Sequence, residues 1–201
     1  MQSPVEQYQQ LLERLDRWFH DVSERRPGVI PCRAGCTACC HGPFDISLAD
    51  VRLLEEGLTR LAPQVRDQVR ARSRALLERM RALAPEWSAP YDVRDLDEER
   101  FDRMTEALAE VPCPLLDDAG ACQVYAHRPM VCRLIGLPMM TAEGELLENA
   151  CPIQEEFPVY ASLDPQLFDL GSLNDAEAEV LDRMGEDPGF ETVIAAVVSA
   201  H

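Results

Sequence analysis

The feature that most restricts this 201-residue chain is the placement of its eight cysteines. Four fall within nine residues, a stretch of 72 residues then contains none, and four more follow within 39 residues. The first block is Cys32, Cys36, Cys39 and Cys40, and the second is Cys113, Cys122, Cys132 and Cys151. Both blocks lie among glycines, prolines and turns, whereas cysteines that only fill a core would be scattered over apolar helix faces. We therefore expect metal-binding thiolates.

The sequence predicts a compartment in which cysteines stay reduced. An even number of cysteines in a secreted chain would suggest disulfides, but the first ten residues have neither a basic start nor an apolar signal core. The chain also has no apolar stretch long enough to span a membrane. We therefore predict a cytoplasmic protein with no membrane partner. The cytoplasm is reducing, so its thiols stay available for metal.

The spacing of the cysteines predicts a site shared between the blocks. The two-residue gap between Cys36 and Cys39 suits a tight turn that offers two sulfurs to a tetrahedral metal. Four ligands from nine residues would be strained, since Cys39 and Cys40 are adjacent and point in different directions. The eight thiolates would fill two four-sulfur sites, or one site with redox-active cysteines to spare. All-thiolate sites suit both zinc and iron-sulfur clusters.

Composition excludes several classes of function. The formal net charge is −17, and the basic residues are all arginine. Without lysine there is no Schiff-base enzyme and no phosphate loop of the usual type. A chain this acidic would repel nucleic acid, so we expect no nucleic-acid partner. No arrangement of nucleophile, histidine and acid supports hydrolase chemistry, and we assign no catalytic residue.

Apolar periodicity and capping residues predict a mainly α-helical single domain over residues 1–201. We expect a helical bundle with an irregular cysteine-rich metal-binding region, formed by residues 28–46 and 111–153 and carrying small β-hairpins. The predicted helices cover residues 3–26, 47–61, 63–85, 98–109 and 175–184, with another from Phe190. The predicted hairpins cover residues 115–125 and 137–147.

Two arginines stand close to the second block. Arg128 and Arg133 lie near Cys132, and their guanidinium groups would stabilise and tune an anionic metal centre as cofactor-binding residues. The alternative is that Arg128 precedes a helix start at Pro129 while Arg133 pairs with an acid. For His41 and His127 we expect a surface or supporting role rather than metal ligation.

Two known patterns match the cysteines. Cys32-x3-Cys36-x2-Cys39 has the spacing of radical S-adenosylmethionine enzymes, but the chain lacks the alternating strands and the length of their barrel. The combined motifs match better elsewhere: these cysteines with Cys40, Cys-Pro-Leu-Leu at 113–116, Cys-Gln-Val-Tyr at 122–125 and His-Arg-Pro-Met-Val-Cys-Arg at 127–133. Across residues 32–152 the chain resembles the YkgJ-type cysteine-cluster family, a zinc- or iron-chelating domain. The resemblance implies that all eight cysteines bind metal. It also favours an iron-sulfur centre, because many members of the family are described as iron-sulfur proteins.

The leading interpretation is a cytoplasmic metal-binding protein that holds an iron-sulfur cluster, of the 4Fe-4S type, through cysteine thiolates. It would transfer electrons or support cluster-dependent chemistry with a redox or protein partner that the sequence does not identify. The alternative cofactor is zinc. Zinc would staple a protein-interaction module, or the chain would act as a metal carrier through exposed Cys39 and Cys40.

Overall fold

The helices begin and end where local sequence signals place them. The computed structural model describes residues 2–32, 35–147, 149–185 and 187–201. Helix α1 (Pro4–Glu24) starts with a reciprocal capping box between Ser3 and Glu6. Helix α2 (Leu48–Thr59) is capped by Ser47, whose hydroxyl accepts the backbone N–H of Asp50. Helix α3 (Pro63–Leu83) begins at a proline, as the first helical position allows. These three predictions are confirmed.

Apart from α7, the remaining elements are shorter than these three helices. They are α4 (Glu98–Ala107), α5 (Val131–Leu134), α6 (Pro158–Ala161), α7 (Leu170–Met184) and α8 (Ile194–Ala200), with 3₁₀ turns at Val93–Asp95, Tyr125–His127 and Gln154–Glu156. The strands are β1 (Asp45–Ser47), β2 (Met139–Met140), β3 (Gln166–Leu167) and β4 (Glu191–Val193). The fold is mainly α with small strand pairs, as predicted.

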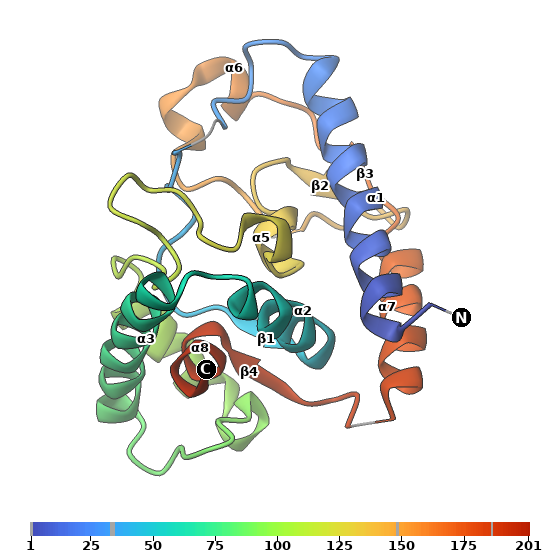
Figure 1. Ribbon diagram of the computed structural model, residues 1–201. Coiled ribbons are helices and arrows are strands. Elements are labelled where there is room, and N and C mark those ends of the chain that lie inside the picture. The colour runs from blue at the N-terminus through green and yellow to red at the C-terminus, as the bar shows by residue number, and fades with distance from the viewer. Residues whose placement is uncertain (1, 33–34, 148, 186) are drawn as a thin grey trace.

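Two helical layers flank the irregular region (Figure 1). Helices α1 and α7 pack together on one side, and α3 packs on α8 on the other, with α2 between them in contact with α1, α7 and α8. One apolar cluster joins α1, α2 and α7 to Leu137 and Met139. Another joins α2, α3 and α8 to Leu115 and Val124, with Cys113 and Cys122 at its margin. The cysteine region is therefore held against the helices from two sides.

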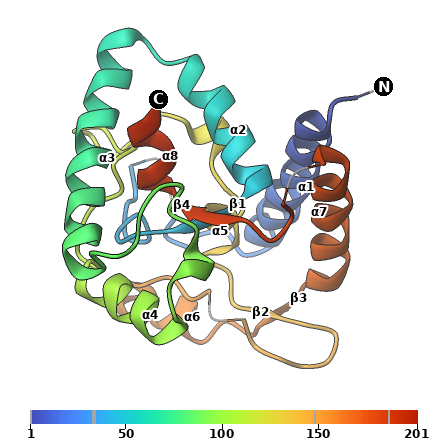
Figure 2. The same ribbon diagram turned by 90° about the horizontal axis from the view of Figure 1, so that it is seen from below.

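Strand pairing closes the chain between distant segments. Strand β1 pairs antiparallel with β4, with Asp45 opposite Val193 and Ser47 opposite Glu191. Figure 2 shows this pair at the centre of the molecule, below α2 and beside α8. The prediction of a helix from Phe190 needs correction, because residues 191–193 form this strand and the helix starts only at Ile194. The backbone of 191–193 finds its hydrogen-bond partners in β1 instead of in a first helical turn.

The two predicted hairpins exist as short bridged turns. Leu116 bridges Cys122 across the first turn, and Met140 bridges Leu146 across the second. Strand β2 also pairs in parallel with β3, a pairing that the local sequence did not indicate. None of the helices in the described ranges is long and apolar enough to cross a membrane.

Candidate metal centre

A backbone ladder fixes the end of the first cysteine block to the start of the second. The N–H of Cys113 donates to the carbonyl of Cys40 at 2.8 Å, and the N–H of Gly42 donates to the carbonyl of Val111 at 2.7 Å. His41 and Pro112 lie opposite each other in the same antiparallel bridge. Cys40 and Cys113 are thereby neighbours across the ladder, although the chain between them includes α2, α3 and α4.

The turn at residues 115–125 also packs on the first block. Gly120 has φ +79°, and a Cβ atom there would lie 2.9 Å from Thr37 Cγ2 and 3.3 Å from the Gly35 carbonyl oxygen. The turn reverses because Asp117 Oδ1 accepts the N–H groups of Ala119 and Ala121. Close packing at a glycine with positive φ places the Cys122 segment beside residues 35–37.

The thiols form two groups by their mutual electrostatic interactions. The first, called the Cys151 group, contains Cys32, Cys36, Cys39 and Cys151. The second, called the Cys132 group, contains Cys40, Cys113, Cys122 and Cys132. Each group combines cysteines of both sequence blocks. All eight are free thiols.

In the Cys151 group, Cys32 is exposed overall, but its thiol is partly buried. Burial of the thiol raises the pKa of Cys32 to about 11, and the charges of Cys151, Cys36 and Cys39 add to the effect. The Cys32 Sγ lies 3.6 Å from the point where a Cβ atom on Gly136 would stand. A Cβ atom at residue 136 would be in ordinary van der Waals contact with this sulfur, and it is the φ of +112° that favours glycine there.

In the Cys132 group, burial is the main influence on the thiols. Burial raises the pKa of Cys132 well above its usual value, and the charges of Cys113, Asp50 and Cys122 raise it further. Burial likewise raises the pKa of Cys113 to about 12, opposed by the Arg72 guanidinium. A buried thiol without a partner stays protonated, whereas a metal ion replaces that proton and stabilises the thiolate.

Cys39 connects the two groups. A hydrogen bond from the Cys40 thiol lowers the pKa of Cys39 to about 7, against the opposing effect of burial. The same hydrogen bond, followed by burial, raises the pKa of Cys40. The charge of Cys39 also acts on Cys32 and on Cys132. The adjacent cysteines thus face different groups, as expected for neighbouring side chains that point in different directions.

The donor set fits a thiophilic metal or cluster. The thiolates of both groups are soft ligands of the kind that zinc and iron-sulfur centres take. Among the side chains in the described ranges, no three histidine, cysteine, aspartate or glutamate residues already stand in a metal-binding arrangement. The backbone brings the two blocks together, but the described sulfurs do not converge on one point, so ligation requires movement of the loops that carry them.

Arg128 and Arg133 both bind Asp16 on α1. Arg128 Nη2 donates to Asp16 Oδ1 at 2.6 Å, and Arg133 Nη1 donates to Asp16 Oδ2. The buried Arg133 also donates to the carbonyls of Arg128 and Ala126, at 3.0 Å and 3.2 Å. Arg133 therefore has the acid partner that the structural alternative required, and its donors tie the Cys132 segment to α1.

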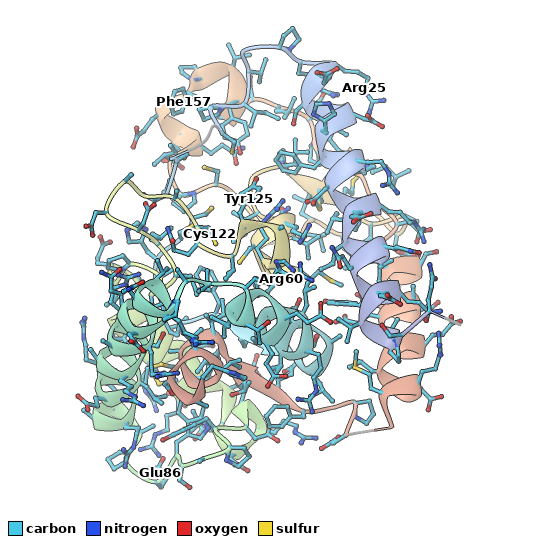
Figure 3. All side chains as sticks on the ribbon, viewed as in Figure 1. Arg25, Arg60, Glu86, Cys122, Tyr125 and Phe157 are labelled. Carbon is cyan, nitrogen blue, oxygen red and sulfur yellow. The ribbon has the colours of Figure 1, made fainter. Side chains whose placement is uncertain are left out.

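Arg128 keeps an electrostatic influence on the thiols. Its guanidinium lies 4.2 Å from the centroid of the Tyr125 ring. Its charge opposes the rise in the pKa of Cys122 that burial causes. Figure 3 shows Cys122 and Tyr125 in the irregular segment between α2 and α6. Arg128 is thus the arginine whose predicted role toward a metal centre has electrostatic support.

The histidines near the motif make other contacts. His127 is buried, and its Nε2 lies 2.7 Å from Arg60 Nη1. Burial lowers the pKa of His127, and the charge of Arg60 lowers it further, so the ring stays neutral and accepts from Arg60. Its Cβ packs so closely on α2 that a Cβ on Gly57 would lie 2.8 Å away. His41 lies in the backbone ladder opposite Pro112.

Three supporting residues escaped the sequence analysis. Asp50 on α2 is buried, and its Oδ1 accepts the N–H of Met130 at 2.9 Å. Asn149 donates to the carbonyls of Leu134 and Leu137, both at 2.6 Å. Tyr160 is fully buried on α6. The position of Asn149 beside Cys151 was a usable signal, while nothing local marked Tyr160.

A mainly helical body around an irregular region, which carries free thiols from two sequence blocks, defines a cysteine-cluster protein. The model of the CxxCxxCC family, described as "putative zinc- or iron-chelating domain", matches residues 31–152. This match covers more than half of the chain, and the chain belongs to that family. No curated protein and no solved structure gives a significant match. Family membership supports metal binding in general.

Proposed function

We propose that the protein holds an iron-sulfur cluster of the 4Fe-4S type through thiolates drawn from both cysteine blocks. The observation that carries the proposal is the mixed composition of the two thiol groups. Cys32 of the first block interacts with Cys151 of the second, and Cys40 of the first block interacts with Cys113 and Cys132 of the second. When bound, the cluster would supply one-electron transfer or cluster-dependent chemistry.

The chain's own residues would position the ligands. The ladder between Cys40 and Cys113 sets the distance between the blocks. Asp50 holds the backbone of the Cys132 segment through Met130, and Arg133 holds the same segment to α1. Arg128 places positive charge near Cys122, where it would favour an anionic centre. We further propose the cytoplasm as its compartment, with a redox or protein partner.

Zinc is the second candidate, and one observation favours it. The eight thiols divide into two sets of four, which is the number of sulfurs in a structural tetrahedral zinc site. Zinc would then hold the irregular region together, and the helices would present a surface to a protein partner. Alternatively, the chain would act as a metal carrier that exchanges ions at Cys39 and Cys40.

The deciding experiment is anaerobic purification followed by metal and sulfide analysis. A brown protein with iron and acid-labile sulfide supports the cluster, and a colourless protein with stoichiometric zinc supports the second candidate. Cys36→Ser and Cys132→Ser should each reduce the metal content, since one comes from each block. A protein without bound metal, or full retention of metal in both variants, would refute thiolate ligation from both blocks.

A further inference from the structure

Tyr160 lies among the thiols of the Cys151 group although it stands outside the family match. The match ends at residue 152, and Tyr160 is carried by the short helix α6 that follows. Its side chain is fully buried. The segment after the cysteine motif therefore folds back onto the motif and inserts an aromatic hydroxyl there.

This hydroxyl has one carbonyl as its hydrogen-bond partner and cysteine side chains nearby. Tyr160 Oη donates to the carbonyl of Gly136. It lies 3.6 Å from the point where a Cβ atom on Gly136 would stand, as does Cys32 Sγ. It also lies close enough to the Cys151 side chain for that side chain to raise its pKa. Burial raises the pKa of Tyr160, and the charges of Cys151 and Cys32 add to this, so the hydroxyl keeps its proton.

We propose that Tyr160 is a positioning residue of the metal centre, whose hydroxyl donates a hydrogen bond to the Cys151 sulfur when that sulfur ligates metal. The inference rests on the proposed function. A free thiol can donate its own proton, but a metal-bound thiolate can only accept. Tyr160 has one proton, which Gly136 accepts in the metal-free chain, and a hydrogen bond to an anionic sulfur is the stronger of the two.

This role has a chemical consequence for the sulfur. Groups that hydrogen-bond to metal ligands fix their orientation and tune the electron density of the metal. A donor to the Cys151 sulfur withdraws electron density from it, which in an iron-sulfur centre raises the reduction potential. Tyr160 would therefore act on the centre through Cys151 without binding metal itself.

The test uses cobalt(II) as a probe, because sulfur-to-cobalt charge-transfer bands report the electron density of ligating thiolates. Loaded wild-type protein should show these bands, and Tyr160→Phe should move them to lower energy. Tyr91→Phe is the matched control, since Tyr91 packs edge-on against Trp87 in a different apolar cluster. It should leave the bands unmoved.

Different outcomes would refute the proposed function and the proposed role of Tyr160. Wild-type protein that gives no sulfur-to-cobalt bands and holds no metal or cluster after anaerobic purification refutes the proposed function. Bands that are present but identical in Tyr160→Phe refute the role of Tyr160, since a merely structural residue would alter thermal unfolding and not the bands. In a Cys151→Ser background, Tyr160→Phe should add no further shift, and a further shift would contradict Cys151 as the acceptor.

A second measurement keeps the proposal testable if Tyr160→Phe fails to fold. Zinc loading of the Tyr125→Phe variant, which lacks the exposed hydroxyl three residues from Cys122, should give a near-ultraviolet tyrosine difference spectrum. That signal arises because the Tyr160 hydroxyl exchanges the Gly136 carbonyl for an anionic sulfur. Stoichiometric zinc binding without any tyrosine difference would overturn the proposal.

Discussion

The Asp50 carboxylate is buried on α2, with Oδ1 accepting hydrogen bonds from the Met130 N–H at 2.9 Å and the Tyr8 hydroxyl at 3.0 Å. The Tyr8 hydroxyl also lies 3.1 Å from Glu177 on α7. One carboxylate thus connects α1, α2 and the backbone beside Cys132. Because a buried charge is costly, the protonation of Asp50 affects the stability of the whole junction.

Burial raises the pKa of Asp50 to about 7, although the hydrogen bonds from Met130 and Tyr8 oppose the shift. In the unfolded chain an aspartate titrates near pH ~4, so the folded protein binds more protons between these values. The free energy of unfolding of the metal-free protein should therefore fall as pH rises from about 4 to about 7, by up to a few kcal/mol from this group. Asp50→Asn keeps the acceptor and should flatten that dependence.

Urea unfolding of both proteins across this pH window checks the prediction. Other groups titrate in both proteins, so the difference between them isolates Asp50. An equally steep pH dependence in Asp50→Asn would show that Asp50 is not the group responsible.

At the scale of elements, the sequence predicted what depends on neighbouring residues. The Ser3 and Ser47 caps, the Pro63 start and the apolar periodicity place α1, α2 and α3, because these signals act within one or two turns. Strands β1 and β4 carry too few residues for a periodic signal and depend on each other across the chain. Their pairing could not be predicted locally.

The candidate site, too, could be predicted from the sequence only in part. The cysteine spacing predicted a site shared by both blocks, and the ladder between Cys40 and Cys113 places the end of one block beside the start of the other. It did not predict that Asp50 would hold the Met130 backbone or that Tyr160 would reach the Cys151 group, because both contacts arise from packing of distant elements. The pairing of Arg133 with an acid was foreseen as an alternative, and its partner Asp16 on α1 is fixed only by the fold.

The packing of the 115–125 turn on the first block gives a test with an internal control. Gly120 and Gly144 both have positive φ, but a Cβ on Gly120 would meet Thr37 at 2.9 Å, whereas nothing lies within 4 Å of a Cβ on Gly144. Alanine at either position should cost about 1–2 kcal/mol of backbone strain. Only Gly120→Ala should also weaken metal binding, measured by competition with a chelator. Equal metal affinity in the two variants would argue against this contact as part of the site.

Docking of α1 onto the Cys132 segment depends on Asp16. Its carboxylate serves both Arg128 and the buried Arg133, whose side chain is 3% exposed. Asp16→Ala would leave the Arg133 charge without its acid partner and should destabilise the protein by about 2 kcal/mol, less than for a fully buried pair because Asp16 is one-third exposed. Asp21→Ala on the same helix, at an exposed position, should cost little. Thermal unfolding of the two variants compares them, and similar losses would contradict the role of Asp16.

At the scale of the whole molecule, metal should stabilise some regions more than others. The described residues 111–147 and 149–153 contain short turns, α5 and the two-residue β2, and few backbone hydrogen bonds of regular helices, whereas α3 and α8 pack directly on each other. Structural thiolate sites can contribute on the order of 10 kcal/mol to folding. We expect chelation to accelerate hydrogen exchange in residues 111–153 while α3 and α8 stay protected. Unchanged exchange in that region after complete metal removal would count against a structural metal.

The pairing of β1 with β4 gives the protein an order of assembly during synthesis. Strand β1 directly follows the first cysteine block, but its partner residues 191–193 come after Cys151. All eight thiols are therefore translated before the strand that closes the molecule exists. The nascent chain presents its full set of sulfurs while the centre is still open, and a donor of metal or cluster has its widest access during that interval.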